Sequence, residues 1–209
     1  MLLDFLKHLF GKRPLPFPAE YFVSDRQFNQ LYPPSIRRAA IKHFTQLDIA
    51  KQAAEFLVNE DKVKILDIGS GAGKFCLAAA YYKPNALFYG VELRANLAEQ
   101  AEFIKNDLGL KNITFIKGSF NELDFKQYNH FYFYNSFYEN IIKEGRIDDK
   151  LPFSKKIFDD YSAQLFQQLE QMPAGTRLVT YHVTKTEIPL SFKVTRESTD
   201  GFLKFCIKI

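Results

Sequence analysis

The stretch Val63-Lys64-Ile65-Leu66-Asp67-Ile68-Gly69-Ser70-Gly71-Ala72-Gly73 decides the fold of this chain. Its first half is a short aliphatic run, typical of a strand that is buried on both faces of a parallel sheet. The alternating glycines that follow allow a sharp turn and a close approach of the backbone to a ligand. Residues 74–82 are apolar and rich in alanine, so we expect a helix whose free N–H groups face that ligand.

A second apolar run, residues 86–91, brings Glu92 to the end of the next predicted strand. A carboxylate about 20 residues after a glycine-rich turn can accept hydrogen bonds from both hydroxyls of a ribose. Folds that bind nicotinamide dinucleotides and folds that bind S-adenosylmethionine share this arrangement. Here the spacing is GxGxG, and Lys74 stands where GxGxxG requires its third glycine, which disfavours a nicotinamide-dependent oxidoreductase.

The order of Asp67, the glycine-rich turn and Glu92 resembles motifs I and II of the class I S-adenosylmethionine-dependent methyltransferases, and the resemblance extends over residues 64–140. It implies S-adenosyl-L-methionine as the cofactor. It also implies an α/β, Rossmann-like, mostly parallel seven-stranded sheet of order 3-2-1-4-5-7-6 with its last strand antiparallel, helices on both faces and an N-terminal helical extension. The implied cofactor-binding residues are Asp67, Gly69, Ser70, Gly71, Gly73, Glu92, Leu93, Ser119, Phe120 and Asn135. The alternative is a bare Rossmann-like core in which the glycines only turn a strand into a helix.

The rest of the chain continues the alternation of strands and helices. Apolar patterns predict strands at 113–116, 131–134, 177–182, 192–195 and 202–209, and helices at 96–108 and 154–172. Ser154 is placed to cap the second of these helices. Residues 36–57 predict two short helices that are broken near Thr45. The connection 182–192 is too short for the helix that the family often has there, which would leave that flank open.

Length and composition indicate one globular domain. The 209 residues are 46% hydrophobic and include 22 Phe, 11 Tyr and no Trp, so we expect a phenylalanine-rich core. We divide the chain into a helical extension, residues 1–60, and a methyltransferase domain, residues 61–209. Cys76 and Cys206 fit no metal spacing and no disulfide framework, so we expect free thiols, no metal and a cytoplasmic protein.

Residues 1–10 have the periodicity of an amphipathic helix, which is too short and too polar to span a bilayer. Such a helix packs on its own domain or on a second copy in a homodimer, or it contacts a membrane surface or a partner. The net charge of +4 is spread along the chain rather than gathered in one basic block.

The resemblance also indicates which residues would contact the adenine ring and the methyl acceptor. Ser119 follows the third predicted strand where motif III usually has an aspartate that meets adenine, so this contact falls to Ser119 or to the backbone N–H of Phe120. Asn135 ends the fourth strand in the place of motif IV. The segment 135–138 is partly similar to the tetrad [DNS]PP[YF] of amino-methyltransferases, with Ser136 and Phe137 in place of both prolines, and to the Asn-Asn-Phe element of the non-SET histone-lysine methyltransferases.

Asn135 is therefore the predicted catalytic residue, whose oxygen would orient an acceptor amine, and the alternative is an asparagine that only satisfies a loop backbone. Each further candidate also has a structural alternative. An adenine or a planar acceptor could stack on Tyr134, Phe137 and Tyr138, or these residues belong to the core. His182 takes a proton from the acceptor, or it only makes hydrogen bonds within its loop. The ligand contacts Tyr32 and Ser35, or these residues only start a helix. The weaker candidates are His130, Glu139 and His43.

These patterns predict a methyltransferase that acts on an amine nitrogen of a protein or another acceptor. A protein amine is favoured over nucleic acid, because no added nucleic-acid-binding module or dense basic stripe accompanies the core. The alternatives are a non-catalytic cofactor-binding or interaction protein, and an rRNA or small-molecule methyltransferase.

Overall fold

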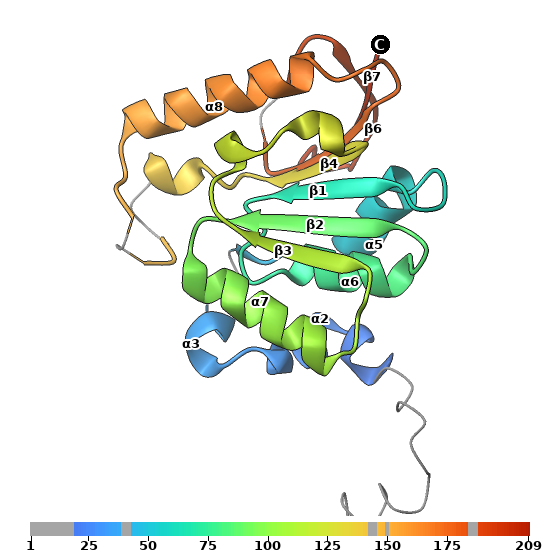
Figure 1. Cartoon of the computed structure of the whole chain (residues 1–209), viewed down its shortest axis with the longest axis vertical. Coiled ribbons are helices and arrows are strands. Elements are labelled where there is room, and N and C mark those ends of the chain that lie inside the picture. Colours follow the sequence, from blue (N-terminus) through green and yellow to red (C-terminus); the bar gives the residue numbers. More distant parts are fainter. Residues whose placement is uncertain (1–18, 39–42, 142–145, 149–150, 184–187) are drawn as a thin grey trace, which may run out of the picture.

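The computed structural model describes residues 19–38, 43–141, 146–148, 151–183 and 188–209, and the helix predicted for residues 1–10 lies outside them. Figure 1 shows one twisted sheet with helices on both sides. The strands are β1 (Lys64–Ile68), β2 (Leu87–Glu92), β3 (Ile113–Lys117), β4 (His130–Tyr134), β5 (Arg177–Tyr181), β6 (Phe192–Glu197) and β7 (Leu203–Lys208). The α-helices are α2 (Asp25–Phe28), α3 (Pro34–Arg37), α5 (Leu47–Leu57), α6 (Lys74–Tyr82), α7 (Ala95–Asp107) and α8 (Lys155–Glu170). Short 3-10 helices are η1 (Ala19–Phe22), η2 (Asn29–Leu31), η3 (Phe120–Glu122), η4 (Phe125–Gln127) and η5 (Tyr138–Asn140).

The seven strands are ordered β3-β2-β1-β4-β5-β7-β6. Strands β1 to β5 are parallel, and β7 pairs antiparallel with both β5 and β6. The predicted strand order and the predicted closing hairpin are therefore confirmed. Because the order reverses between β1 and β4, the carboxyl ends of these two strands flank the crevice in which open α/β sheets bind ligands.

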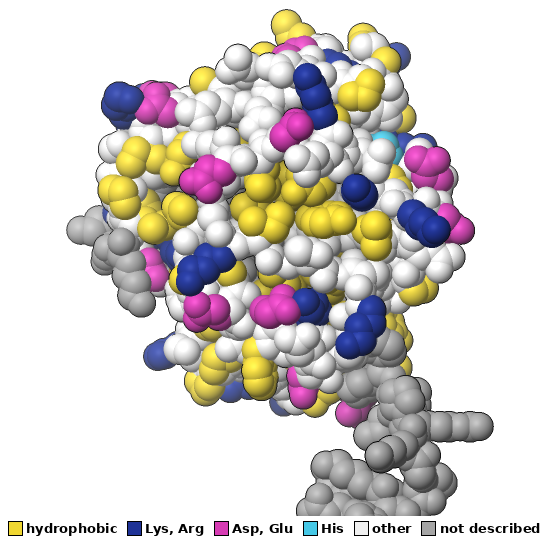
Figure 2. Space-filling view, viewed as in Figure 1, with side chains coloured by type: hydrophobic (Ala, Val, Ile, Leu, Met, Phe, Trp, Pro, Cys, Tyr) yellow, Lys and Arg dark blue, Asp and Glu magenta, His cyan; other side chains and the backbone are white. Residues whose placement is uncertain are grey.

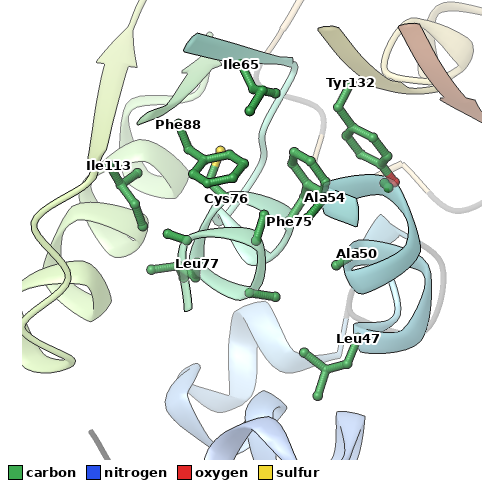
Figure 3. Close-up of a cluster of buried hydrophobic side chains, with 14 of the residues drawn as sticks. Leu47, Ala50, Ala54, Ile65, Phe75, Cys76, Leu77, Phe88, Ile113 and Tyr132 are labelled. Atoms are coloured by element: carbon green, nitrogen blue, oxygen red, sulfur yellow. The ribbon is translucent and has the colours of Figure 1, made fainter. Parts of the chain in front are cut away.

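One face of the sheet carries α5, α6 and α7 together with the segment that precedes them (Figure 1). In the core of this layer the Phe75 ring of α6 stacks on Tyr132 of β4 with ring centroids 3.8 Å apart, and Figure 3 shows Ala50 and Ala54 of α5 beside them. The hydroxyl groups of Tyr132 and Thr45 lie 2.9 Å apart. The small alanine side chains let α5 and α6 lie close to each other. The large aromatic side chains of the sheet fill the rest of this layer.

The other face is covered by α8 and by the short turns η3 and η4. The connection between β3 and β4 forms only these two turns, and as a result Tyr89, Ile116 and Leu123 are only partly buried. Figure 2 shows hydrophobic side chains gathered in the middle of this face, with basic and acidic side chains interspersed around them.

Most helices and strands begin and end near the residues that the local sequence pattern predicts. The side chain of Ser154 accepts the N–H of Ile157 and caps α8, as predicted. Residues 45 and 46 are non-helical, so the predicted break near Thr45 is confirmed. Helix α5 shares one hydrophobic core with β1 and α6, and the domain division at residue 60 stays a prediction. Within the described residues no helix has the length and apolar character needed to cross a membrane.

Candidate active site

A cavity of about 320 Å³ opens at the carboxyl ends of β1, β2, β3 and β4, which is within the size range of small-molecule sites. Its walls come from the loops that follow these four strands, from the segment between β4 and α8, from the first turns of α8 and from His43 and Phe44. The predicted site residues that line it are Gly69, Gly71, Glu92, Leu93, Ser119, Phe120 and Asn135. The strand ends thus bring seven of the ten predicted cofactor residues to one cavity.

The glycine-rich turn is held against the end of β2. The N–H groups of Gly69 and Ser70 both donate to the carbonyl of Val91, at 3.0 and 2.9 Å. Gly71 has φ +55°, and a Cβ built on it meets nothing within 4 Å. Since Gly71 lines the cavity, the space that a side chain would occupy is open to a ligand.

The turn also touches the loop after β4. Gly69 has φ +75°, and a Cβ there would lie 2.3 Å from Ser136 Oγ. The Ser136 hydroxyl donates to the Ile68 carbonyl at 2.7 Å. Gly69 therefore provides the room that the Ser136 side chain needs. Sequence reasoning did not identify this contact, because its two residues are 67 positions apart.

The Glu92 carboxylate lies beside the turn and is only 6% exposed. Its Oε2 accepts the N–H of Gly71 at 2.9 Å, and its Oε1 accepts the N–H of Arg94 at 2.8 Å. Burial raises the pKa of Glu92, while these two backbone hydrogen bonds lower it. A carboxylate oxygen can accept two hydrogen bonds, so each oxygen keeps capacity for one more donor. Two fixed acceptors at the edge of a cavity fit a ribose diol.

Asp67, Ser70 and Gly73 do not line the cavity. Burial raises the pKa of Asp67 to about 8, and its Oδ2 accepts the Cys76 thiol at 3.5 Å. The Ser70 side chain packs against Gly90, where an added Cβ would lie 2.8 Å from it. A Cβ on Gly73 would lie 2.6 Å from the Phe115 ring. These residues support the turn from behind, and their direct contact with a cofactor stays a prediction.

Aromatic side chains form the wall on the side of β3. The Phe120 ring stacks on Phe137 with centroids 5.1 Å apart and meets Tyr161 of α8 edge-on at 5.6 Å. All three residues line the cavity together with Ser119. The backbone N–H of Phe120 makes no hydrogen bond within the described parts of the chain. This wall thus offers a flat apolar surface with one free donor, as an adenine ring requires.

Asn135 ends β4 in the left-handed region, with φ +38°, a conformation that asparagine tolerates better than most residues. It is half-buried and lines the cavity. No hydrogen bond of its side-chain amide is formed with any residue that the structure describes. The amide is therefore free to contact a molecule in the cavity.

An ionic cluster that sequence reasoning missed closes one side of the cavity. The Arg94 guanidinium pairs with Glu139 and with Asp148, the latter at 3.2 Å. Glu139 Oε1 also accepts the N–H of Ile147 at 3.0 Å and lies 3.9 Å from His43 Nδ1. Arg94 follows Glu92 by two positions, but nothing in the sequence indicates that its partners lie 45 and 54 residues away.

Among the other candidates from the sequence, Tyr134, Phe137, Tyr138, Glu139 and His43 also line the cavity, whereas Tyr32, Ser35, His130 and His182 do not. Tyr32 is buried and donates to the Ala72 carbonyl at 3.1 Å, behind the glycine-rich turn. Ser35 is exposed, and neither residue lines the cavity. His130 Nδ1 accepts the N–H of Arg177 at 3.0 Å, and burial lowers its pKa to about 4. Its two ring nitrogens are used within the fold, which excludes it from the site.

Lys74, which replaces the third glycine of a dinucleotide motif, is buried and donates to Asp25 and Asn29. It fastens α6 to the N-terminal segment. Cys76 and Cys206 are free and buried, as predicted. No cluster of three or more potential metal ligands exists among the described residues.

The comparisons with known proteins agree with this geometry. A family model described as a methyltransferase domain matches residues 59–200. A segment of 56 residues, 27% of this chain and 24% of the relative, is 45% identical to a tRNA (guanine-N(7)-)-methyltransferase of Synechococcus sp. (strain JA-3-3Ab). Over 116 residues, 53% of this chain and 40% of the relative, the identity to a release factor glutamine methyltransferase of Buchnera aphidicola is 27%. The matches thus span less than half the length of these relatives.

The fold resembles that of an RNA methyltransferase from Salinibacter ruber in complex with S-adenosyl-L-homocysteine, with a TM-score of 0.52 and 19% identity over 78% of this chain and 89% of that one. This likeness confirms the predicted fold class. The family model covers more than half of the chain and confirms the family that the glycine-rich turn and Glu92 indicated. The chain therefore belongs to the methyltransferase domain family, whose cofactor is S-adenosyl-L-methionine.

Proposed function

We propose that the protein transfers a methyl group from S-adenosyl-L-methionine to a nitrogen atom of its acceptor. The observation that carries the proposal is the Glu92 carboxylate, which two backbone N–H groups fix beside the open space at Gly71. Such an acceptor pair, next to a glycine-rich turn, matches the ribose and methionine parts of this cofactor. The family membership of residues 59–200 supports it.

The chain's residues have separate tasks in this proposal. The cofactor supplies an electrophilic methyl group, and its sulfur leaves with the electrons of the broken bond. Glu92 orients the ribose, and the stacked rings of Phe120 and Phe137 form the wall against which the base lies. Positioning of this kind supplies much of the rate. Where the acceptor nitrogen carries a hydrogen, as an amine or amide does and guanine N7 does not, the Asn135 side-chain oxygen accepts that hydrogen and directs the nitrogen lone pair to the methyl carbon. This oxygen lines the cavity and has no partner among the described residues.

A nitrogen acceptor is consistent with both curated relatives, which are named for guanine N7 and for glutamine. The preference for protein over nucleic acid rested on the lack of an added nucleic-acid-binding module and of a dense basic stripe, and the tRNA methyltransferase relative weighs against that preference. The cytoplasmic location and the homodimer stay predictions.

Paired variants test the assignment of roles. Calorimetry with S-adenosyl-L-homocysteine should show that Glu92→Ala weakens binding by about 1–3 kcal/mol, because ribose hydroxyls lose their acceptor. Asn135→Ala should bind the same ligand as the wild type does, but it should transfer methyl groups about a hundredfold more slowly. Equal losses of affinity in both variants would contradict this division of roles.

The acceptor can be sought with tritiated S-adenosyl-L-methionine in a lysate of the source cells, followed by nuclease or protease treatment. Label that is lost with nuclease indicates a nucleic acid, and label that is lost with protease indicates a protein. A folded protein that binds neither S-adenosyl-L-methionine nor its demethylated product would refute the proposal, and NADH in the same titration would detect the nicotinamide alternative.

A further inference from the structure

Four aromatic side chains stand in a row along the carboxyl edge of the sheet, from β4 across β5 to the start of β7. We call this row, which consists of Tyr134, Tyr181, His182 and Phe202, the aromatic shelf. Tyr134 and Tyr181 are paired neighbours with ring centroids 4.7 Å apart. The His182 ring lies 5.7 Å from Tyr134 and 4.3 Å from Phe202, and it is inclined by 27° to each. Tyr134, His182 and Phe202 therefore form an offset stack, and Tyr181 packs against its side, inclined by 52° to Tyr134 and by 60° to His182.

The backbone at His182 is strained to place this ring. His182 has φ +54°, which few residues other than glycine adopt. Its N–H donates to the Phe202 carbonyl at 2.9 Å. The buried Lys204 donates from Nζ to the carbonyls of Val183, at 2.9 Å, and Gly201. Strain that several contacts hold in place is a frequent feature of functional sites.

The aromatic shelf joins the cavity to the protein surface. At one end Tyr134 lines the cavity next to Asn135, whose amide has no partner in the described parts of the chain. At the other end Phe202 is 47% exposed. A ring that stacks at the Tyr134 end of the shelf would thus lie close to the amide that we assign to the acceptor nitrogen.

The rings of the shelf are uncharged near neutral pH. Burial and the nearby Lys204 lower the pKa of His182, which Asp200 opposes, and burial raises the pKa of Tyr134 to about 12. A cage for an ammonium group needs rings that surround the cation. The rings of the shelf instead lie against one another, with neighbouring centroids 4.3 to 5.7 Å apart, which leaves no space between them for a cation. The stacked rings of Tyr134, His182 and Phe202 are better suited to stack with one more flat ring.

We infer that the aromatic shelf binds the acceptor as a planar heteroaromatic ring, that is, a nucleobase or a similar free heterocycle, rather than an aliphatic amine. This inference rests on the proposed function, because Asn135 at the end of the shelf is taken as the group that meets the acceptor nitrogen. It assigns a specificity role to His182 and Phe202, which lie outside the walls of the cofactor cavity.

The test uses 2-aminopurine riboside, whose fluorescence falls when it stacks, titrated into the full chain saturated with S-adenosyl-L-homocysteine. A second titration uses a short single-stranded RNA that contains one 2-aminopurine. Phe202→Leu keeps an apolar side chain and removes a ring, and His182→Asn removes a ring while tolerating the positive φ. The control is Phe103→Leu, which alters a 65% exposed phenylalanine on α7.

We expect both shelf variants to bind a probe about tenfold more weakly than the wild type and the control do. Binding of RNA alone would mean that the ring belongs to a polynucleotide, and binding of the riboside as well would mean that a free heterocycle suffices. Equal affinities in all four proteins, no quenching at all, or displacement of the probe by a peptide with an unmodified lysine side chain would overturn the inference and leave the proposed function standing. Failure of S-adenosyl-L-homocysteine to bind would instead overturn the proposed function, and the inference with it.

Discussion

Replacing Gly69 by alanine tests whether the glycine-rich turn and the loop after β4 depend on their close contact. The added Cβ would lie 2.3 Å from Ser136 Oγ and 2.4 Å from Ser136 Cβ, and φ at this position is +75°. A side chain in the left-handed region costs about 1–2 kcal/mol, and overpacking costs about 1–3 kcal/mol more. We expect Gly69→Ala to lower the free energy of unfolding by about 2–5 kcal/mol.

A matched control separates the two contributions. Gly109 has φ +66°, and a Cβ there meets nothing within 4 Å. Gly109→Ala therefore carries the backbone cost without the clash. It also changes the entropy of the unfolded chain in the same way, so that this contribution cancels in the comparison. Urea unfolding followed by circular dichroism measures both variants. Gly69→Ala should cost less stability in a Ser136→Gly background, where the clash is absent, than in the wild type.

Two outcomes would show that the glycine-rich turn does not depend on its close contact with Ser136. Gly69→Ala could prove no less stable than Gly109→Ala, which would mean that the Ser136 side chain yields without cost. Alternatively, Gly69→Ala could cost as much stability in the Ser136→Gly background as in the wild type, which would mean that the two residues do not interact.

Gly71→Ala should destabilise the fold no more than Gly109→Ala does, because its Cβ enters open space. Calorimetry should nevertheless show that S-adenosyl-L-homocysteine binds this variant more weakly by about 1–3 kcal/mol, since the ligand occupies that space. Unchanged affinity would contradict the assignment. The pKa of Asp67 is raised from 3.8 to about 8, so the folded protein retains a proton that the unfolded chain releases, and stability should fall as the pH rises between these values, by up to about 1.4 kcal/mol per pH unit. Asp67→Asn should remove this slope in urea unfolding between pH 5 and pH 8, and parallel curves for the two proteins would show that the carboxyl is ionised in the fold.

The sequence predicts well what a local pattern encodes. The strand, turn and helix around Gly69 to Gly73 follow from aliphatic residues, alternating glycines and an alanine-rich run, and the helix predicted at 74–82 matches α6. Ser154 caps α8 because its side chain reaches an N–H three residues further on. The order of the strands required the family resemblance, since parallel pairing leaves no local trace.

Contacts between distant segments could not be predicted in this way. Ser136 occupies a position where the resemblance has proline, and only the fold shows that its hydroxyl reaches the end of β1. In the sequence Gly90 is only a strand residue without a side chain, but the structure shows that a side chain there would collide with Ser70. The partners of Arg94 lie beyond β3 and β4, and long charged side chains have no preferred partner in a sequence pattern.

The walls of the cavity come from the loops after four parallel strands, and these loops become neighbours only when β1 to β4 have paired in register. Pairs of parallel strands join distant parts of the chain and form slowly, whereas the β6–β7 hairpin is local. A partly folded chain that holds only this hairpin has nothing with which to recognise a cofactor. Ligand added during refolding should therefore leave the folding rate unchanged and instead retard unfolding, which makes the lifetime of the native state a measure of occupancy.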